Sequence, residues 1–156
     1  MDSRISTLNK EATTLNKEGH VEAAIERLIE CKALMQHSTT SYSTKAWLRL
    51  PLFMQKAGRF DEAMVEFTWL IGTTVERIGR HYSHQPRGVR AYLEHAELAE
   101  IHEAMALACK REKRPADTER YANLAAVHRA QWAAFKAIED QRKREDRAQR
   151  VAARGI

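Results

Sequence analysis

Apolar residues recur every three or four positions through most of this chain, the spacing that places them on one face of a helix. Two segments, 15–28 and 54–67, superimpose without a gap. In each segment a lysine and then a glycine end one amphipathic stretch, and acidic residues open the next. Gly19 and Gly58 permit the left-handed turn that follows many helices, and a lysine in the last turn suits the negative end of the helix dipole. The pattern therefore predicts a helix, a short turn and a second helix, repeated twice.

The two predicted hairpins also share a small residue, Ala24 or Ala63, where their helices would approach closely. Around these alanines the chain resembles the tetratricopeptide repeat, whose pattern is W-x2-L-G-x2-Y followed by A-x3-F. The resemblance covers about residues 5–75. The positions that carry it are Trp47, Leu50, Pro51, Met54, Ala63 and Phe67 in the second unit and Leu8, Glu11, Ala12, Leu15, Ala24 and Leu28 in the first.

The match departs from the family pattern in three ways. Pro51 stands where the pattern has a small residue, and neither unit carries the closing proline. The glycines Gly19 and Gly58 are 39 residues apart, whereas the repeat length of the family is about 34. An insertion is therefore expected near His37–Ser43.

The second half is predicted to form a longer third hairpin. The stretch from Gly79 to Gly88 has no helical periodicity, a helix is expected from about Val89 to Lys110, and the residues up to Pro115 break it. A last helix then follows, with Pro115 or Asp117 at its start. Its expected buried stripe comprises Tyr121, Leu124, His128, Trp132, Phe135 and Ile138. We interpret this hairpin as a divergent repeat or as a cap with a polar outer face.

The predicted fold is all-α: antiparallel helical hairpins stacked as a short, tetratricopeptide-like α-solenoid of about six helices. Residues 1–138 are expected to form this single domain. Residues 139–156 hold 6 basic and 4 acidic side chains and no apolar stripe. They are expected to form a charged C-terminal extension, either a protruding helix or a disordered tail.

Composition agrees with a helical domain and adds a charge asymmetry. The chain has 156 residues with only 6 Gly and 3 Pro, so there are few places at which regular structure must break. Residues 1–75 carry 9 basic and 9 acidic side chains, whereas residues 76–156 carry 17 and 12. With two isolated cysteines, no secretory signal and no apolar run long enough for a membrane span, we predict a cytoplasmic protein that does not contact membranes.

No catalytic residue, metal ligand or cofactor site is predicted. The sequence has no glycine-rich phosphate loop, no G-x-S-x-G elbow and no H-E-x-x-H helix. His95, His102 and Cys109 recur every seven residues and share one helix face. Neighbours in this series are about 10 Å apart along a helix, too far for one metal ion. They are expected to flank the packing stripe, and the chain is not expected to be an enzyme.

The resemblance implies a binding surface. In the tetratricopeptide family the first helix of each hairpin lines a concave groove that binds extended peptides, and some members clamp a terminal carboxylate there. The residues that align with this groove are Asn9, Thr13 and Asn16 in the first unit and Lys45, Arg49, Leu52 and Lys56 in the second. Lys45 and Arg49 match one clamp pair, but Asn9 and Thr13 replace an expected lysine and asparagine. The two bases and the amides can still satisfy a carboxylate.

We therefore expect a non-enzymatic protein-binding module: an adaptor, a co-chaperone or a stoichiometric regulator of a protein or peptide partner, including acidic partners. The alternative is a nucleic-acid-binding protein that uses the basic second half. Both hypotheses can use a basic end of the stack, formed by Arg80, Tyr82, Arg87, Arg90, Lys113 and Arg114. The sequence leaves open whether the protein is a monomer or a homodimer.

Overall fold

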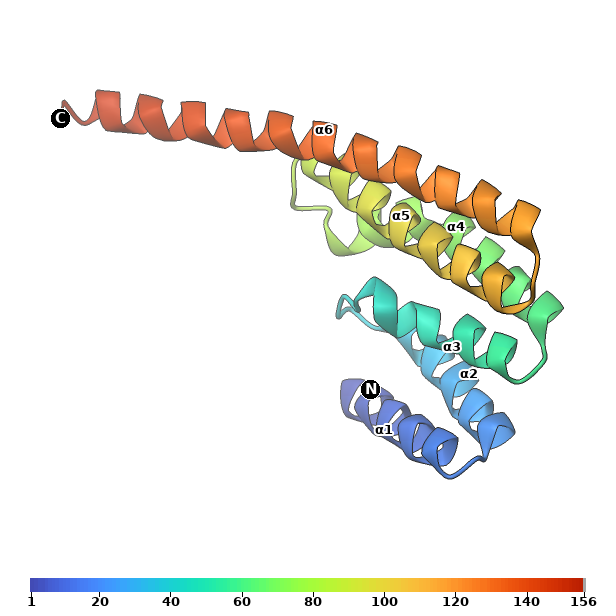
Figure 1. Ribbon diagram of the computed structural model, residues 1–156. Helices are drawn as coiled ribbons and strands as arrows, with labels where there is room; N and C mark the ends of the chain where they lie inside the picture. The colour runs from blue at the N-terminus through green and yellow to red at the C-terminus, as the bar shows by residue number, and fades with distance from the viewer. Residues whose placement is uncertain (156) are drawn as a thin grey trace.

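The computed structural model describes residues 1–155, which fold into six α-helices (Figure 1). The helices are α1 Asp2–Lys17, α2 Val21–His37, α3 Thr44–Lys56, α4 Phe60–His81, α5 Arg87–Arg111 and α6 Pro115–Ala153. There is no β-strand within the described residues. The predicted all-α fold is thus confirmed.

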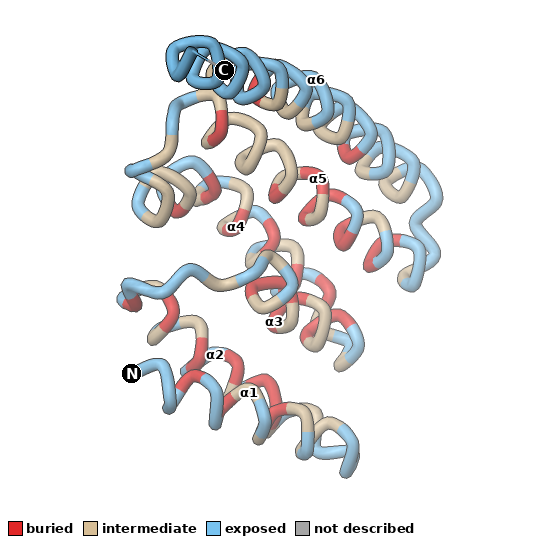
Figure 2. The backbone as a smooth tube through the Cα atoms, turned by 90° about the vertical axis from the view of Figure 1, so that its left-hand side faces the viewer, coloured by how far each residue is buried: buried red, intermediate tan, exposed pale blue. Residues whose placement is uncertain are grey.

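The helices pack as three antiparallel hairpins, α1/α2, α3/α4 and α5/α6. Successive hairpins contact one another through α2 with α3 and through α4 with α5, and α3 also packs on α5. Figure 2 shows the hairpins stacked from the N-terminus to the C-terminus, with buried residues between the layers. This arrangement confirms the predicted stack of six helices, and the likeness to the tetratricopeptide repeat remains a resemblance.

The first two hairpins share one packing pattern. Ala24 of α2 and Ala63 of α4 are both completely buried, as expected where paired helices approach closely. Four residues further along, Leu28 and Phe67 are also buried and belong to the same continuous core. The apolar positions of the repeat motif therefore build the core of this half.

All three hairpins turn in the same way. The backbone N–H of Gly19 donates to Asn16, and that of His20 donates to Leu15. The second turn repeats both bonds around Gly58 and the third repeats them around Lys113. The φ angles of the three central residues are 85°, 78° and 56°. The third hairpin thus has the turn of the repeat, but a lysine stands where the other two have glycine.

Replacing Lys113 with glycine should stabilise the protein. A non-glycine residue in the left-handed region costs about 1–2 kcal/mol, while glycine adds about 0.5–1 kcal/mol of unfolded-state entropy. We expect the Lys113→Gly variant to gain about 0.5–1 kcal/mol in the free energy of unfolding, measured by urea denaturation. Gly58→Lys is the matched reverse change and should lose stability, and a Lys113→Gly variant that is less stable than wild type would contradict the strained turn.

The insertion predicted near His37–Ser43 forms the connection between α2 and α3, and Asp2 holds it. One carboxylate oxygen of Asp2 accepts hydrogen bonds from Ser38 Oγ and Tyr42 OH, both at 2.8 Å. The other oxygen accepts from Thr40 Oγ1 at 2.7 Å. These bonds, with that from Thr40 the largest cause, lower the pKa of Asp2 to about 2. The extra residues are therefore tied to the first turn of α1.

The stripe predicted to be buried on α6 is covered only in part, because Tyr121, His128 and Phe135 contact α5 whereas Leu124 and Ile138 are exposed. α6 runs without a break past residue 138, and its last part extends beyond the rest of the molecule (Figure 1). Leu124, Phe135 and Ile138, which were predicted to be buried, are 38%, 37% and 63% exposed. Within residues 1–155, α5 is the one helix that α6 packs against, so a narrow strip is covered, and its buried members are Ala125 and Glu139. Large apolar side chains that are exposed on α6 include Leu124, Val127, Phe135 and Ile138.

No helix within residues 1–155 has a segment that is both long enough and apolar enough to cross a membrane.

Candidate functional site

Arg49 joins the first helices of the first two hairpins. Its Nη1 donates to the backbone oxygen of Asn9 at 3.1 Å and to Asn9 Oδ1 at 2.8 Å. Its Nη2 donates to Thr13 Oγ1 at 2.8 Å. The guanidinium also lies over the ring of Phe53, at 5.3 Å from the centroid. We call the surface formed by Asn9, Thr13, Arg49 and Phe53 the α1/α3 face.

The positive charge of Arg49 has no acidic partner. All three of its acceptors are neutral, and none of the ion pairs among residues 1–155 includes Arg49. Partial burial lowers the pKa of Arg49, but arginine stays protonated at neutral pH. A guanidinium has five N–H donors, so two remain after the three bonds to Asn9 and Thr13. The α1/α3 face therefore offers a held cation that can still donate to an anion.

The other residues predicted for the groove differ in how far their side chains are exposed. Lys45 and Lys56 are exposed and belong to none of the ion pairs in the described part of the chain. Leu52 is half-buried against the core, and Asn16 is half-buried on α1. At helical spacing Lys45, Arg49, Leu52 and Lys56 lie within one side of α3. Phe53 was missed by the sequence reasoning, although its position four residues after Arg49 could have indicated it.

The six residues predicted for a basic end do not lie together. Arg80, Tyr82, Arg87 and Arg90 flank the turn between α4 and α5, whereas Lys113 and Arg114 follow the other end of α5. α5 has 25 residues, and a helix of that length spans about 36 Å. Partner binding by either group of basic residues stays a prediction.

Three members of the predicted basic end, Arg80, Tyr82 and Arg114, already have contacts within the protein. Arg80 Nη1 donates to the backbone oxygen of Gln36 at 2.8 Å. The hydroxyl of Tyr82 lies 3.2 Å from Ser41 Oγ, and the Arg114 guanidinium lies 4.3 Å from the centroid of the Phe60 ring. Within residues 1–155, the members whose side chains have no ion pair, no ring contact and no hydrogen bond to another group are Arg87, Arg90 and Lys113.

Three histidines form a ladder of rings between α5 and α6. His128 of α6 stacks between His95 and His102 of α5, with ring centroids 5.3 Å and 5.2 Å away. Phe135 continues the ladder beside His95 at 5.5 Å, and Tyr121 lies 6.3 Å from His102. Burial, followed by the charges of His102 and His95, lowers the pKa of His128. The ladder therefore favours the neutral form of His128 and serves to pack the third hairpin.

The ladder also explains the heptad spacing of His95 and His102, because that spacing places both rings against α6. Cys109, the third member of the series, is fully buried, and burial raises the pKa of its thiol. Among residues 1–155 there is no group of three or more His, Cys, Asp or Glu side chains that could hold a metal ion.

No family model, curated protein or solved structure matches this chain. The tetratricopeptide resemblance therefore rests on the motif positions and on the repeated turns around Gly19, Gly58 and Lys113. Function has to be inferred from the surfaces themselves.

Proposed function

We propose that this protein is a non-enzymatic protein-binding module whose α1/α3 face holds a carboxylate of an extended segment from another protein. The observation that supports it is the half-buried guanidinium of Arg49, fixed by neutral acceptors and without an acid. Charge-assisted bonds from arginine to a carboxylate are among the strong hydrogen bonds of proteins. Asn9 and Thr13 position the cation in advance, which reduces the entropy lost on binding.

The neighbouring residues of α3 extend this surface along a peptide. Lys45 precedes Arg49 by one helical turn and Lys56 follows it by two turns, about 6 Å and 10 Å along the helix. Leu52 and Phe53 provide apolar contact area between these charges. A peptide with a terminal or side-chain carboxylate and a nearby apolar residue fits this pattern. A module of this kind acts as an adaptor, a co-chaperone or a stoichiometric regulator.

Nucleic acid binding is the weaker candidate. Phosphate binding benefits from many bases on one surface, and here the predicted basic residues are divided between the two ends of α5. One acidic side chain, that of Glu94, also lines the same pocket as Arg87 and Arg90. The two candidates differ in salt dependence, so one experiment can separate them.

Replacing Lys45 and Lys56 with glutamate should weaken the binding of the partner at least tenfold. Both lysines are exposed and unpaired, so this variant should fold normally and keep the bonds of Arg49 to α1. A second variant, Lys45→Ala with Arg49→Ala, removes the cation itself and should abolish binding. Wild-type and variant proteins would each be immobilised and incubated with cell lysate. The lysate proteins that each one retains would then be quantified by mass spectrometry. The affinity of each retained protein would then be measured with purified components.

The matched control is Lys10→Ala with Lys143→Ala, which removes two exposed bases from α1 and α6. It should retain the same protein with unchanged affinity. Peptides from the partner with a free or an amidated terminus would show whether the carboxylate is the C-terminal one. Equal loss in the control variant, or recovery of nucleic acid with a steep salt dependence in place of a protein, would count against the proposed function.

A further inference from the structure

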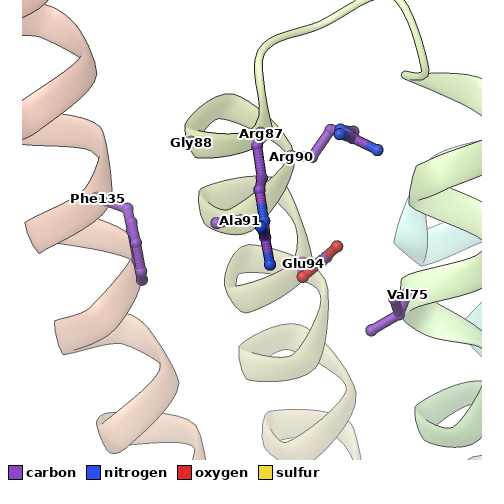
Figure 3. A pocket seen from close by; sticks show the side chains of 7 residues that line it. All are labelled: Val75, Arg87, Gly88, Arg90, Ala91, Glu94 and Phe135. Atoms are coloured by element: carbon purple, nitrogen blue, oxygen red, sulfur yellow. The ribbon is translucent and has the colours of Figure 1, made fainter.

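A pocket of about 610 Å³ lies at the other half of the molecule, beside the start of α5. Figure 3 shows Val75 of α4 on one side, Phe135 of α6 on the other and Ala91 of α5 between them. Arg87, Arg90 and Glu94 of α5 also line it. We call this the α4/α6 pocket. It contains none of the residues of the α1/α3 face, so an inference about it does not depend on the proposed function.

The walls of the α4/α6 pocket carry large apolar side chains that other parts of the protein leave uncovered. Val75 is 63% exposed and Phe135 is 37% exposed. Ile138, one turn after Phe135 on α6, is 63% exposed and extends the apolar surface beyond the pocket. Grouped apolar side chains with a polar rim are typical of surfaces that bind another protein.

The charged residues of the pocket leave an excess of positive charge. Among the lining residues, Arg87 and Arg90 are accompanied by one acid, Glu94, and neither arginine forms an ion pair in residues 1–155. The carboxylate of Glu139 on α6 lies against Gly88 at the edge of the pocket, but it is already paired with Arg142. The Nε of Arg90 is buried and has no hydrogen-bond acceptor within the described residues. A buried donor without an acceptor is unfavourable, so the protein itself leaves part of the donor capacity of Arg90 unused.

We propose that the α4/α6 pocket binds an amphipathic helix of a partner protein, with apolar side chains between Val75 and Phe135 and an acidic side chain at Arg87 and Arg90. The occupant is helical because the pocket lies between two helices over a third, a shape into which a helix can place residues at i, i+3, i+4 and i+7. The occupant is acidic because the charge of the pocket is complementary to an acid. Nucleic acid fits less well, because a phosphate chain would gain nothing from the apolar side chains of Val75 and Phe135.

A selection from a displayed library of helix-favouring peptides tests this proposal. The library would be selected in parallel on the wild-type protein, on Val75→Glu and on Arg87→Glu. Both residues are exposed on helices, so these variants should fold normally. The matched control is Val65→Glu, because Val65 is 68% exposed on the same helix as Val75 and does not line the pocket.

The wild-type protein and the Val65→Glu control should enrich peptides with an apolar helical stripe and an aspartate or glutamate at one end. Synthetic copies should bind at least tenfold more weakly to Val75→Glu and to Arg87→Glu. The peptides should bind normally to the Lys45→Glu, Lys56→Glu variant, which separates this surface from the α1/α3 face.

Several results would overturn the proposal. These are a library that enriches no acidic helices, peptides that lose as much affinity to Val65→Glu as to Val75→Glu, and peptides that nucleic acid displaces at low concentration. Sedimentation analysis tests the remaining occupant, a second copy of this chain. A wild-type dimer that Val75→Glu converts to monomers would show that the pocket serves self-association and not a partner helix.

Discussion

Replacing Arg77 with alanine should lower the free energy of unfolding by about 3–5 kcal/mol, the usual cost of breaking a buried ion pair. Arg77 of α4 and Glu97 of α5 form an ion pair in which the side chains are only 7% and 6% exposed. Arg77 also donates to the backbone oxygen of Leu70 at 2.8 Å and lies 5.0 Å from the centroid of the Trp47 ring. Without Arg77, the carboxylate of Glu97 would remain buried with no cation.

The size of this loss matters because a domain is typically stable by about 5–15 kcal/mol. Urea denaturation followed by tryptophan fluorescence measures it directly, since both Trp47 and Trp69 lie beside the Arg77 guanidinium. The control is the double variant Arg77→Met with Glu97→Leu, which removes both charges and keeps similar volume. It should be clearly more stable than Arg77→Ala, because no uncompensated charge is left.

The pair also bears on the architecture, because it links the second hairpin to the third. If Arg77→Ala and the double variant were equally stable, the ion pair would have no specific role in holding α4 against α5. A loss below about 1 kcal/mol for Arg77→Ala would indicate that Glu97 reaches water in solution, because solvent-exposed ion pairs contribute about 0–1 kcal/mol to stability.

The hairpins of the first half could be predicted because their signals are local. Gly19 and Gly58 each follow a lysine and precede acidic residues, and every bond of these turns joins residues at most five positions apart. The third turn has the same hydrogen bonds, but its central residue is Lys113. A comparison that searches for glycine therefore does not find this turn. Its remaining signal was Pro115, which occupies the first turn of α6.

The candidate site could be predicted only in part. The register of the repeat placed Arg49 on the surface of the first helices, but not its bonds to Asn9 and Thr13, which lie 40 and 36 residues away. Such bonds depend on how two helices are placed relative to each other, and the apolar periodicity of each helix does not contain that information. The prediction of a carboxylate clamp at Lys45 and Arg49 stays a prediction, and it did not include the bonds that hold Arg49 against α1.

The separation of the basic residues, in contrast, could have been derived. A helix was expected between Arg87 and Lys113, and at about 1.5 Å per residue it holds its two ends far apart. The rotation of α6 could not be derived. Leu124, His128 and Phe135 lie on one stripe of that helix, at positions i, i+4 and i+11, and the position of α5 decides how much of the stripe is covered. The α4/α6 pocket depends on the same rotation and was therefore missed as well.

Replacing Ala63 with leucine should lower the free energy of unfolding by about 1–3 kcal/mol, because a larger side chain overpacks a filled core. Ala63 is completely buried on α4 and belongs to the continuous core, as does its counterpart Ala24 on α2. For a chain of this length the loss corresponds to a decrease of about 2–12 °C in melting temperature. Thermal unfolding followed by circular dichroism measures that decrease.

The same substitution at two other alanines decides what the loss means. Ala33→Leu adds an equal side chain at an exposed position of α2, so it should leave the melting temperature almost unchanged. Ala24→Leu should decrease it about as much as Ala63→Leu, because the two positions are equivalent in the repeat and equally buried. If Ala24→Leu left the melting temperature unchanged while Ala63→Leu lowered it, the helices of the two hairpins would pack differently despite their matching turns. If leucine were tolerated at both positions, the helices of each hairpin could not approach as closely as the buried alanines require.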